Sequence, residues 1–190
     1  MLFVGNDAPG WHNIYFCIYM QRLIDIFKSG VIGTSAMTVF SYLYAYIVKD
    51  NVKEPKLLAK MFRRLVPGTD KLNARIAGWV IHYAVGLLFA ELYIELWERT
   101  SVKADVKSGL ILGGLSGIAA ILIWKFTLES HPIPPSVDFT KHAVNLIIAH
   151  LIFGVFAVLA YKPWEKNGNF KGISHEKKTP DTLAFEEYNH

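Results

Sequence analysis

The chain has 190 residues, of which 52% are hydrophobic and 19% are charged, and its mean hydropathy is +0.26. This composition is too apolar for the surface of an ordinary soluble globular domain, so it favours an integral membrane protein. The formal net charge of +4 would suit a nucleic-acid binder, but no recognised nucleic-acid-binding module accompanies it, and we expect no nucleic-acid partner.

The first 28 residues are expected to precede the first membrane span. Residues 1–10 contain glycine, asparagine and proline and are typical of an irregular lead-in. Residues 11–27 are rich in aromatic side chains at first, but polar residues then interrupt the apolar run, at Gln21, Arg22, Asp25 and Lys28. We therefore predict an amino-terminal helix that lies at the membrane interface, with a short extra membrane anchor as the competing interpretation.

Four apolar stretches bounded by charges follow, at residues 31–48, 76–97, 110–128 and 143–161. Each has roughly the length of about 20 residues that an α-helix needs to cross a hydrocarbon core of ~30 Å. We predict an all-α membrane protein with four transmembrane helices. A soluble buried bundle is the alternative, but a small core does not need four runs of this length.

The connection between the first two spans is strongly basic. Within it, residues 54–65 combine an apolar face, several lysines and arginines, and a proline in the first turn. This pattern predicts a short amphipathic helix, which should lie on the lipid headgroups.

The second half of the chain repeats the first. Five residues, Pro67, Asp70, His82, Gly86 and Tyr93, recur 68 positions later as Pro135, Asp138, His150, Gly154 and Tyr161. The starts of the first and third spans also match, at an offset of 79, because the first copy has the longer connection. We predict two parallel two-helix repeats, residues 29–97 and 98–161, related by an axis along the membrane normal and followed by a polar tail at 162–190.

Duplication places His82 and His150 at one membrane depth, where ionisable side chains are costly and are functional candidates. Three interpretations stay open. Each neutral imidazole bonds a neighbouring helix or a water; or the two ligate one cofactor, such as a bis-histidine haem, with Gly86 and Gly154 making room one turn away; or they line a path for protons or a small solute.

Two further charged residues are candidates for a polar site. Lys125 lies near the end of the third span, about one turn from His82 in depth, unless its side chain extends to the membrane interface. Glu91 lies about half a turn round the second span from His82 and either pairs within the bundle or marks a water-filled cavity.

Other patterns are assigned to packing and capping. The stripe of Gly109, Gly113 and Gly117 on the third span predicts close contact with another helix, within this chain or in a dimer. Asp70 and Asp138 each precede a helix and should cap it. A metal site built from His131, Asp138 and His142 is conceivable, but this spacing fits no recurrent ligand pattern.

No phosphate-binding loop, His-Glu-x-x-His motif or nucleophile elbow occurs, so we expect no enzyme. The sequence favours a multi-pass protein of a bacterial inner membrane: a small transport or permeation unit, or an accessory subunit, with a polar site between His82 and His150. We expect a lipid bilayer and a proton or small solute as partners, and a homodimer, because four helices enclose little space. The alternative is a haem-binding electron carrier; otherwise no cofactor is expected.

Overall fold

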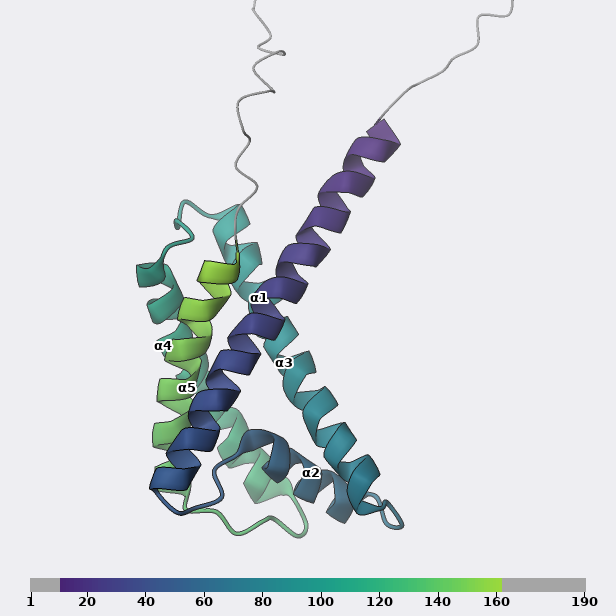
Figure 1. Ribbon diagram of the computed structural model, residues 1–190, viewed down its shortest axis with the longest axis vertical. Helices are drawn as coiled ribbons and strands as arrows, with labels where there is room; N and C mark the ends of the chain where they lie inside the picture. Colours follow the sequence, from purple (N-terminus) through teal and green to yellow (C-terminus); the bar gives the residue numbers. More distant parts are fainter. Residues whose placement is uncertain (1–10, 162–190) are drawn as a thin grey trace, which may run out of the picture.

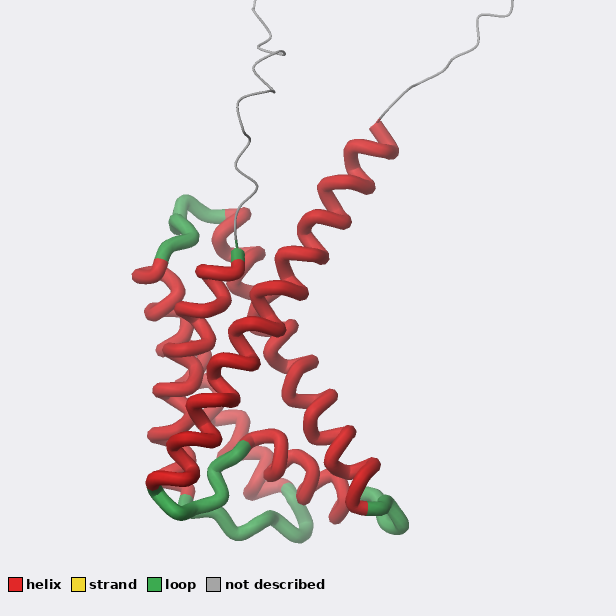
Figure 2. Tube along the Cα trace, viewed as in Figure 1, coloured by secondary structure: helices red, strands yellow, loops and turns green. Residues whose placement is uncertain are grey.

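The computed structural model describes residues 11–161, with side chains from Tyr15 onward. The expected lead-in and polar tail lie outside the described residues. The described part is entirely helical, with five helices and no strand: α1 (Trp11–Ile47), α2 (Glu54–Leu65), α3 (Lys71–Arg99), α4 (Val106–Ser130) and α5 (Phe139–Ala160). Figure 2 shows these helices joined by short loops.

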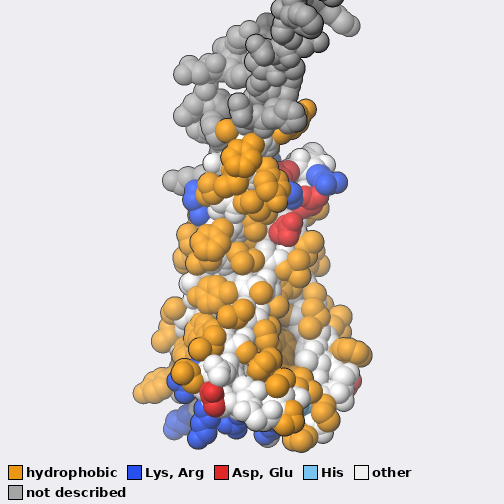
Figure 3. Space-filling view, turned by 90° about the vertical axis from the view of Figure 1, so that its right-hand side faces the viewer, with side chains coloured by type: hydrophobic (Ala, Val, Ile, Leu, Met, Phe, Trp, Pro, Cys, Tyr) orange, Lys and Arg blue, Asp and Glu red, His pale blue; other side chains and the backbone are white. Residues whose placement is uncertain are grey.

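Four of the helices, α1, α3, α4 and α5, are long and apolar enough to cross a membrane, which confirms the four expected spans. Their outward-facing side chains are largely apolar, and Figure 3 shows a mostly hydrophobic body with charged side chains gathered toward its two ends. Lipid-facing apolar side chains between charged ends are the surface that a multi-pass integral membrane protein requires.

The first helix differs from its expected form. Instead of an interfacial helix followed by a separate span, α1 runs for 37 residues without a break at Lys28-Ser29-Gly30. Gly30 continues the helix because its missing side chain is used in packing: a Cβ there would lie 3.0 Å from the Cα of Leu87 on α3. At 1.5 Å per residue α1 is about 55 Å long, so it extends well beyond a ~30 Å hydrocarbon core or tilts strongly within it.

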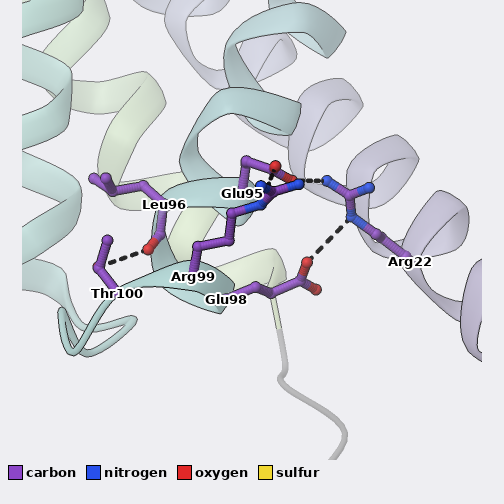
Figure 4. Close-up of polar contacts among 6 residues, drawn as sticks. All are labelled: Arg22, Glu95, Leu96, Glu98, Arg99 and Thr100. Carbon is purple, nitrogen blue, oxygen red and sulfur yellow. Dashed lines mark hydrogen bonds and ion pairs between the residues drawn. The ribbon is translucent and has the colours of Figure 1, made fainter.

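An ion-pair cluster ties α1 to the end of α3 (Figure 4). The guanidinium of Arg22 pairs with Glu95, and its Nε lies 3.1 Å from Oε2 of Glu98. Arg99 also pairs with Glu95. The sequence alone places these two glutamates in solvent, whereas the structure pairs them and leaves them only partly exposed. They link α1 to the end of α3.

Close backbone contacts join the spans in pairs (Figure 1). A Cβ on Gly113 of α4 would lie 2.5 Å from the carbonyl oxygen of His150 on α5. One on Gly86 of α3 would lie 1.8 Å from Oγ1 of Thr34 on α1. The α4 stripe therefore packs against another helix as predicted, and that helix belongs to the same chain.

The amphipathic helix of the first connection is present as α2, with proline in its first turn. Its apolar side is buried, with Leu57 and Met61 in one cluster with Ala120, Trp124 and Leu146 of α4 and α5. The predicted caps are confirmed as well: Asp70 accepts a hydrogen bond from the Asn73 amide at 2.8 Å, and Asp138 accepts one from the Lys141 amide at 3.2 Å. These capped ends start α3 and α5 at the same end of the bundle as α2.

Candidate functional site

A cavity of about 130 Å³ lies inside the bundle, and all five helices contribute to its wall. The backbone of α3 packs on α1 and α2, and that of α4 packs on α5. α3 meets α4 through side chains, with hydrogen bonds from Tyr93 to Ser116 and from Trp97 to Ser108. Most of the wall is apolar. Three titratable side chains line it, Glu54 from α2, His82 from α3 and His150 from α5, and we call it the histidine–glutamate cavity.

His82 is buried and is held through one ring nitrogen. Its Nε2 lies 2.8 Å from the hydroxyl oxygen of Thr38 on α1. The hydroxyl proton of Thr38 is already donated to the carbonyl of Thr34 at 2.6 Å, so the Thr38 oxygen accepts from His82 Nε2–H. This network assigns the lone pair of the neutral ring to Nδ1.

His150 is held in a comparable way by its own helix. Its Nδ1 lies 2.8 Å from the carbonyl oxygen of Leu146, an acceptor only, so Nδ1 carries the proton and the lone pair of the neutral ring is on Nε2. The ring edge also meets Phe89 of α3, with 5.6 Å between centroids. Both histidines that the repeat singled out thus have one nitrogen fixed as a donor and the other able to accept a proton.

Glu54 is the residue that sequence reasoning missed. It is the first residue of α2 and only 3% exposed. The side-chain amide of Asn145 and the hydroxyl of Ser41 both donate to its Oε1, the latter at 3.2 Å, while Oε2 has no hydrogen-bond partner among the described residues. Burial raises the pKa of this carboxyl to about 7, against the lowering effect of its hydrogen bonds.

The two glycines that the repeat matches, Gly86 and Gly154, lie in different surroundings. Gly86 lines the cavity, where it packs against α1. Gly154 packs against α4 instead, where a Cβ would lie 2.0 Å from the carbonyl oxygen of Gly109, and it is not part of the cavity wall.

The two charged candidates lie outside the cavity. Lys125 is exposed on α4 and borders a separate surface depression with Leu128 and Glu129. Glu91 is exposed on α3, in keeping with its position half a turn from His82, and it does not line the cavity. Neither side chain joins the histidines.

The structure does not bring His131, Asp138 and His142 together as a metal site. His131 bonds the carbonyl of Met61 through Nε2 at 3.2 Å and the amide of Ile133 through Nδ1 at 3.0 Å, so it fastens the loop to α2. His142 is buried against Trp124, with 4.9 Å between ring centroids. Among the described residues no group of three or more histidine, cysteine or acidic side chains is placed to hold a metal ion.

The histidine–glutamate cavity is small beside typical ligand pockets. Ligand pockets typically enclose roughly 300–1,000 Å³, well above the 130 Å³ found here. The Nε2 of His82 is held by Thr38 on α1.

Comparisons of the chain with known protein families, curated proteins and solved structures found no match.

Proposed function

We propose that this protein is a small membrane transport or permeation unit and that the histidine–glutamate cavity is the site through which it passes protons. The observation that carries this proposal is that three buried side chains from three different helices, Glu54, His82 and His150, line one cavity. Ionisable side chains are expensive at membrane depth and are rare unless they serve a pathway or a pair.

The protonation chemistry of the three groups supports protons as the cargo. Each neutral histidine keeps one lone pair. Within residues 15–161, one carboxyl oxygen of Glu54 has no hydrogen-bond partner, and the pKa of this carboxyl is raised to about 7. A carboxylate and two imidazoles lining one cavity are a set of groups typical of membrane proton paths. A volume of about 130 Å³ also has room for several waters to bridge them.

The proposed path runs from the α2 end to the middle of the membrane. Glu54 is the first residue of α2, at the end of the bundle where α3 and α5 begin. Each histidine lies eleven residues after the first residue of its span, which is about 16 Å along the helix from that start. Beyond the histidines, Phe153 and Tyr93 belong to a buried apolar cluster, and the Tyr93 hydroxyl bonds Ser116 at 2.6 Å. Complete passage therefore requires movement at this closed end.

We further propose that the two halves of the chain are duplicated repeats, as the sequence predicts. Matching contacts support this: Gly86 packs on Thr34 in the first half, and Gly154 packs on Gly113 in the second, at the offsets of 68 and 79. A homodimer is proposed because four spanning helices enclose little space. The bacterial inner membrane as location rests on the sequence pattern.

The test is proton uptake by liposomes that contain the purified protein and a trapped pH dye, driven by a potassium diffusion potential. We expect uptake above that of protein-free liposomes, and severalfold slower uptake for Glu54→Gln and for His82→Ala. Glu91→Gln is the matched control, because it removes a carboxylate from α3 outside the cavity.

Equal rates for the cavity variants and the wild type would overturn the proposal. So would uptake no faster than in protein-free liposomes, a result that favours the accessory-subunit alternative.

A further inference from the structure

A second concave site lies at the α2 end of the bundle, between α2 and α3, and faces outward. It has a volume of about 540 Å³ and two aromatic side chains in its wall, Tyr42 and Trp79. We call it the basic pocket, because five cationic residues line it: Lys56, Lys60 and Arg63 from α2, and Lys71 and Arg75 from α3. In the part of the chain that the structure describes, no acidic residue is part of its wall. Figure 3 shows lysine and arginine side chains gathered at one end of the apolar body.

The positive charge of the basic pocket is not neutralised within the described part of the chain. None of the ion pairs found there uses one of its five cations. The pKa of Lys56 is lowered, first by the charge of Lys53 and further by partial burial and by Arg75 and Lys60. Lys53 and Lys56 place their ammonium groups 5.0 and 5.7 Å from the ring centre of Tyr42, which offsets only part of this repulsion. Crowded cations of this kind concentrate anions.

The position of the basic pocket suits the headgroup of a lipid. Lys71 is the first residue of α3 and Trp79 lies eight residues later, so the wall extends about 12 Å from the helix start. Tryptophan and tyrosine favour this depth, where headgroups meet acyl chains. Exposed apolar residues of α3 lie beside this wall, at Leu72, Ile76 and Val80, and others continue toward the membrane centre, at Val85 and Leu88.

We propose that the basic pocket binds the phosphate of an anionic phospholipid, with the acyl chains lying against the exposed apolar side of α3. Free phosphate shares the anionic chemistry, but it would leave that apolar side unused. This inference is independent of the proton path, because no residue of the basic pocket lines the histidine–glutamate cavity.

The test measures binding of phosphatidylglycerol and phosphatidylcholine to the full chain in uncharged detergent, by native mass spectrometry and thermal unfolding. The pocket variant is Lys56→Gln with Arg75→Gln, and the control, Lys103→Gln with Lys107→Gln, makes the same charge change in an exposed loop and helix start at the other end. Since each cation near the surface contributes about fivefold, we expect the pocket variant to bind phosphatidylglycerol about 30-fold more weakly. The control should change affinity by less than about twofold.

Three results would overturn the inference: equal binding of phosphatidylcholine, equal weakening in the control, or the same thermal stabilisation by inorganic phosphate at equal concentration. Without lipid, the pocket variant should unfold at a temperature no lower than the wild type, because it loses like-charge repulsion. If it does not fold, Arg63→Gln against its exposed neighbour Arg64→Gln, which lies outside the pocket, makes the same comparison with one charge. The first should weaken binding about fivefold, and equal effects would overturn the inference.

Discussion

The contact between α4 and α5 gives a sharp test of the packing, because two adjacent glycines on α4 have opposite surroundings. A Cβ on Gly113 would lie 2.5 Å from the carbonyl oxygen of His150 and 2.9 Å from the Cα of Leu151. These are backbone atoms, so relief requires the two helices to separate. A Cβ on Gly114 would meet only a side-chain methyl of Leu151, at 3.8 Å. Gly113→Ala and Gly114→Ala are therefore a matched pair.

Both substitutions gain about 1 kcal/mol of helix propensity. Only Gly113→Ala adds an overpacking cost, typically 1–3 kcal/mol, and a backbone clash belongs in the upper part of that range. We expect Gly113→Ala to lower the free energy of unfolding by about 1–2 kcal/mol and Gly114→Ala to leave it unchanged or to raise it by up to about 1 kcal/mol.

The measurement is equilibrium unfolding in mixed micelles with increasing dodecyl sulfate, followed by helical circular dichroism. Equal stability of the two variants would refute the close approach of α4 to α5. It would also remove the reason for placing His150 beside this contact.

Three further predictions concern the burial of Glu54, the ion pairs of Arg22 and the duplication. The pKa of Glu54 is about 7 in the folded chain, against an ordinary value of 4.5, so the folded chain binds this proton more tightly than the unfolded chain does. The free energy of unfolding should therefore fall by roughly 3 kcal/mol as pH rises from about 4.5 to 7. Glu54→Gln should not show this fall, and identical pH profiles of the two proteins would contradict the burial of Glu54. Arg22→Gln removes the partner of Glu95 and Glu98. It should lower the free energy of unfolding by up to about 1 kcal/mol, since the ion pairs are partly exposed, and it should increase proteolysis of the amino-terminal part of α1. An unchanged cleavage rate would contradict the ion-pair cluster. In an experimental structure the second and fourth spans should superpose by a rotation about the membrane normal that brings His82 onto His150, and clearly different depths for the two histidines would contradict the duplication.

Features that depend on one helix or on chain spacing were predictable from the sequence. The four spans, the amphipathic α2 and the caps at Asp70 and Asp138 follow from local patterns, and the structure confirms them. Depth in the membrane is likewise a matter of counting residues, so the sequence alone indicates both His82 and His150 as candidates.

Features that depend on the rotation of a helix or on distant partners were not predictable. Lys125 has the expected position along α4, but its neighbour Trp124 is the buried one, and adjacent residues point about 100° apart. Glu54 belongs to a basic amphipathic helix, where a glutamate is normally solvated. Its burial follows from Ser41 and Asn145, which lie on two other helices and come together with it only in the folded chain. The continuity of α1 was missed because Gln21, Arg22, Asp25 and Lys28 interrupt its apolar run. The residue that packs on Gly30, Leu87, is remote in sequence.

The most direct test of the central claim is a double-mutant cycle on proton uptake with His82→Ala, His150→Ala and the combination, each also measured for its free energy of unfolding. If both histidines serve one path, each single change should reduce uptake to nearly the same low rate, and the double variant should be no slower, because groups that act as a unit are non-additive. Uptake unchanged in all three variants, with separate and additive losses of roughly 0.6–2 kcal/mol in stability, would show that each imidazole only bonds its own surroundings, and it would contradict the account.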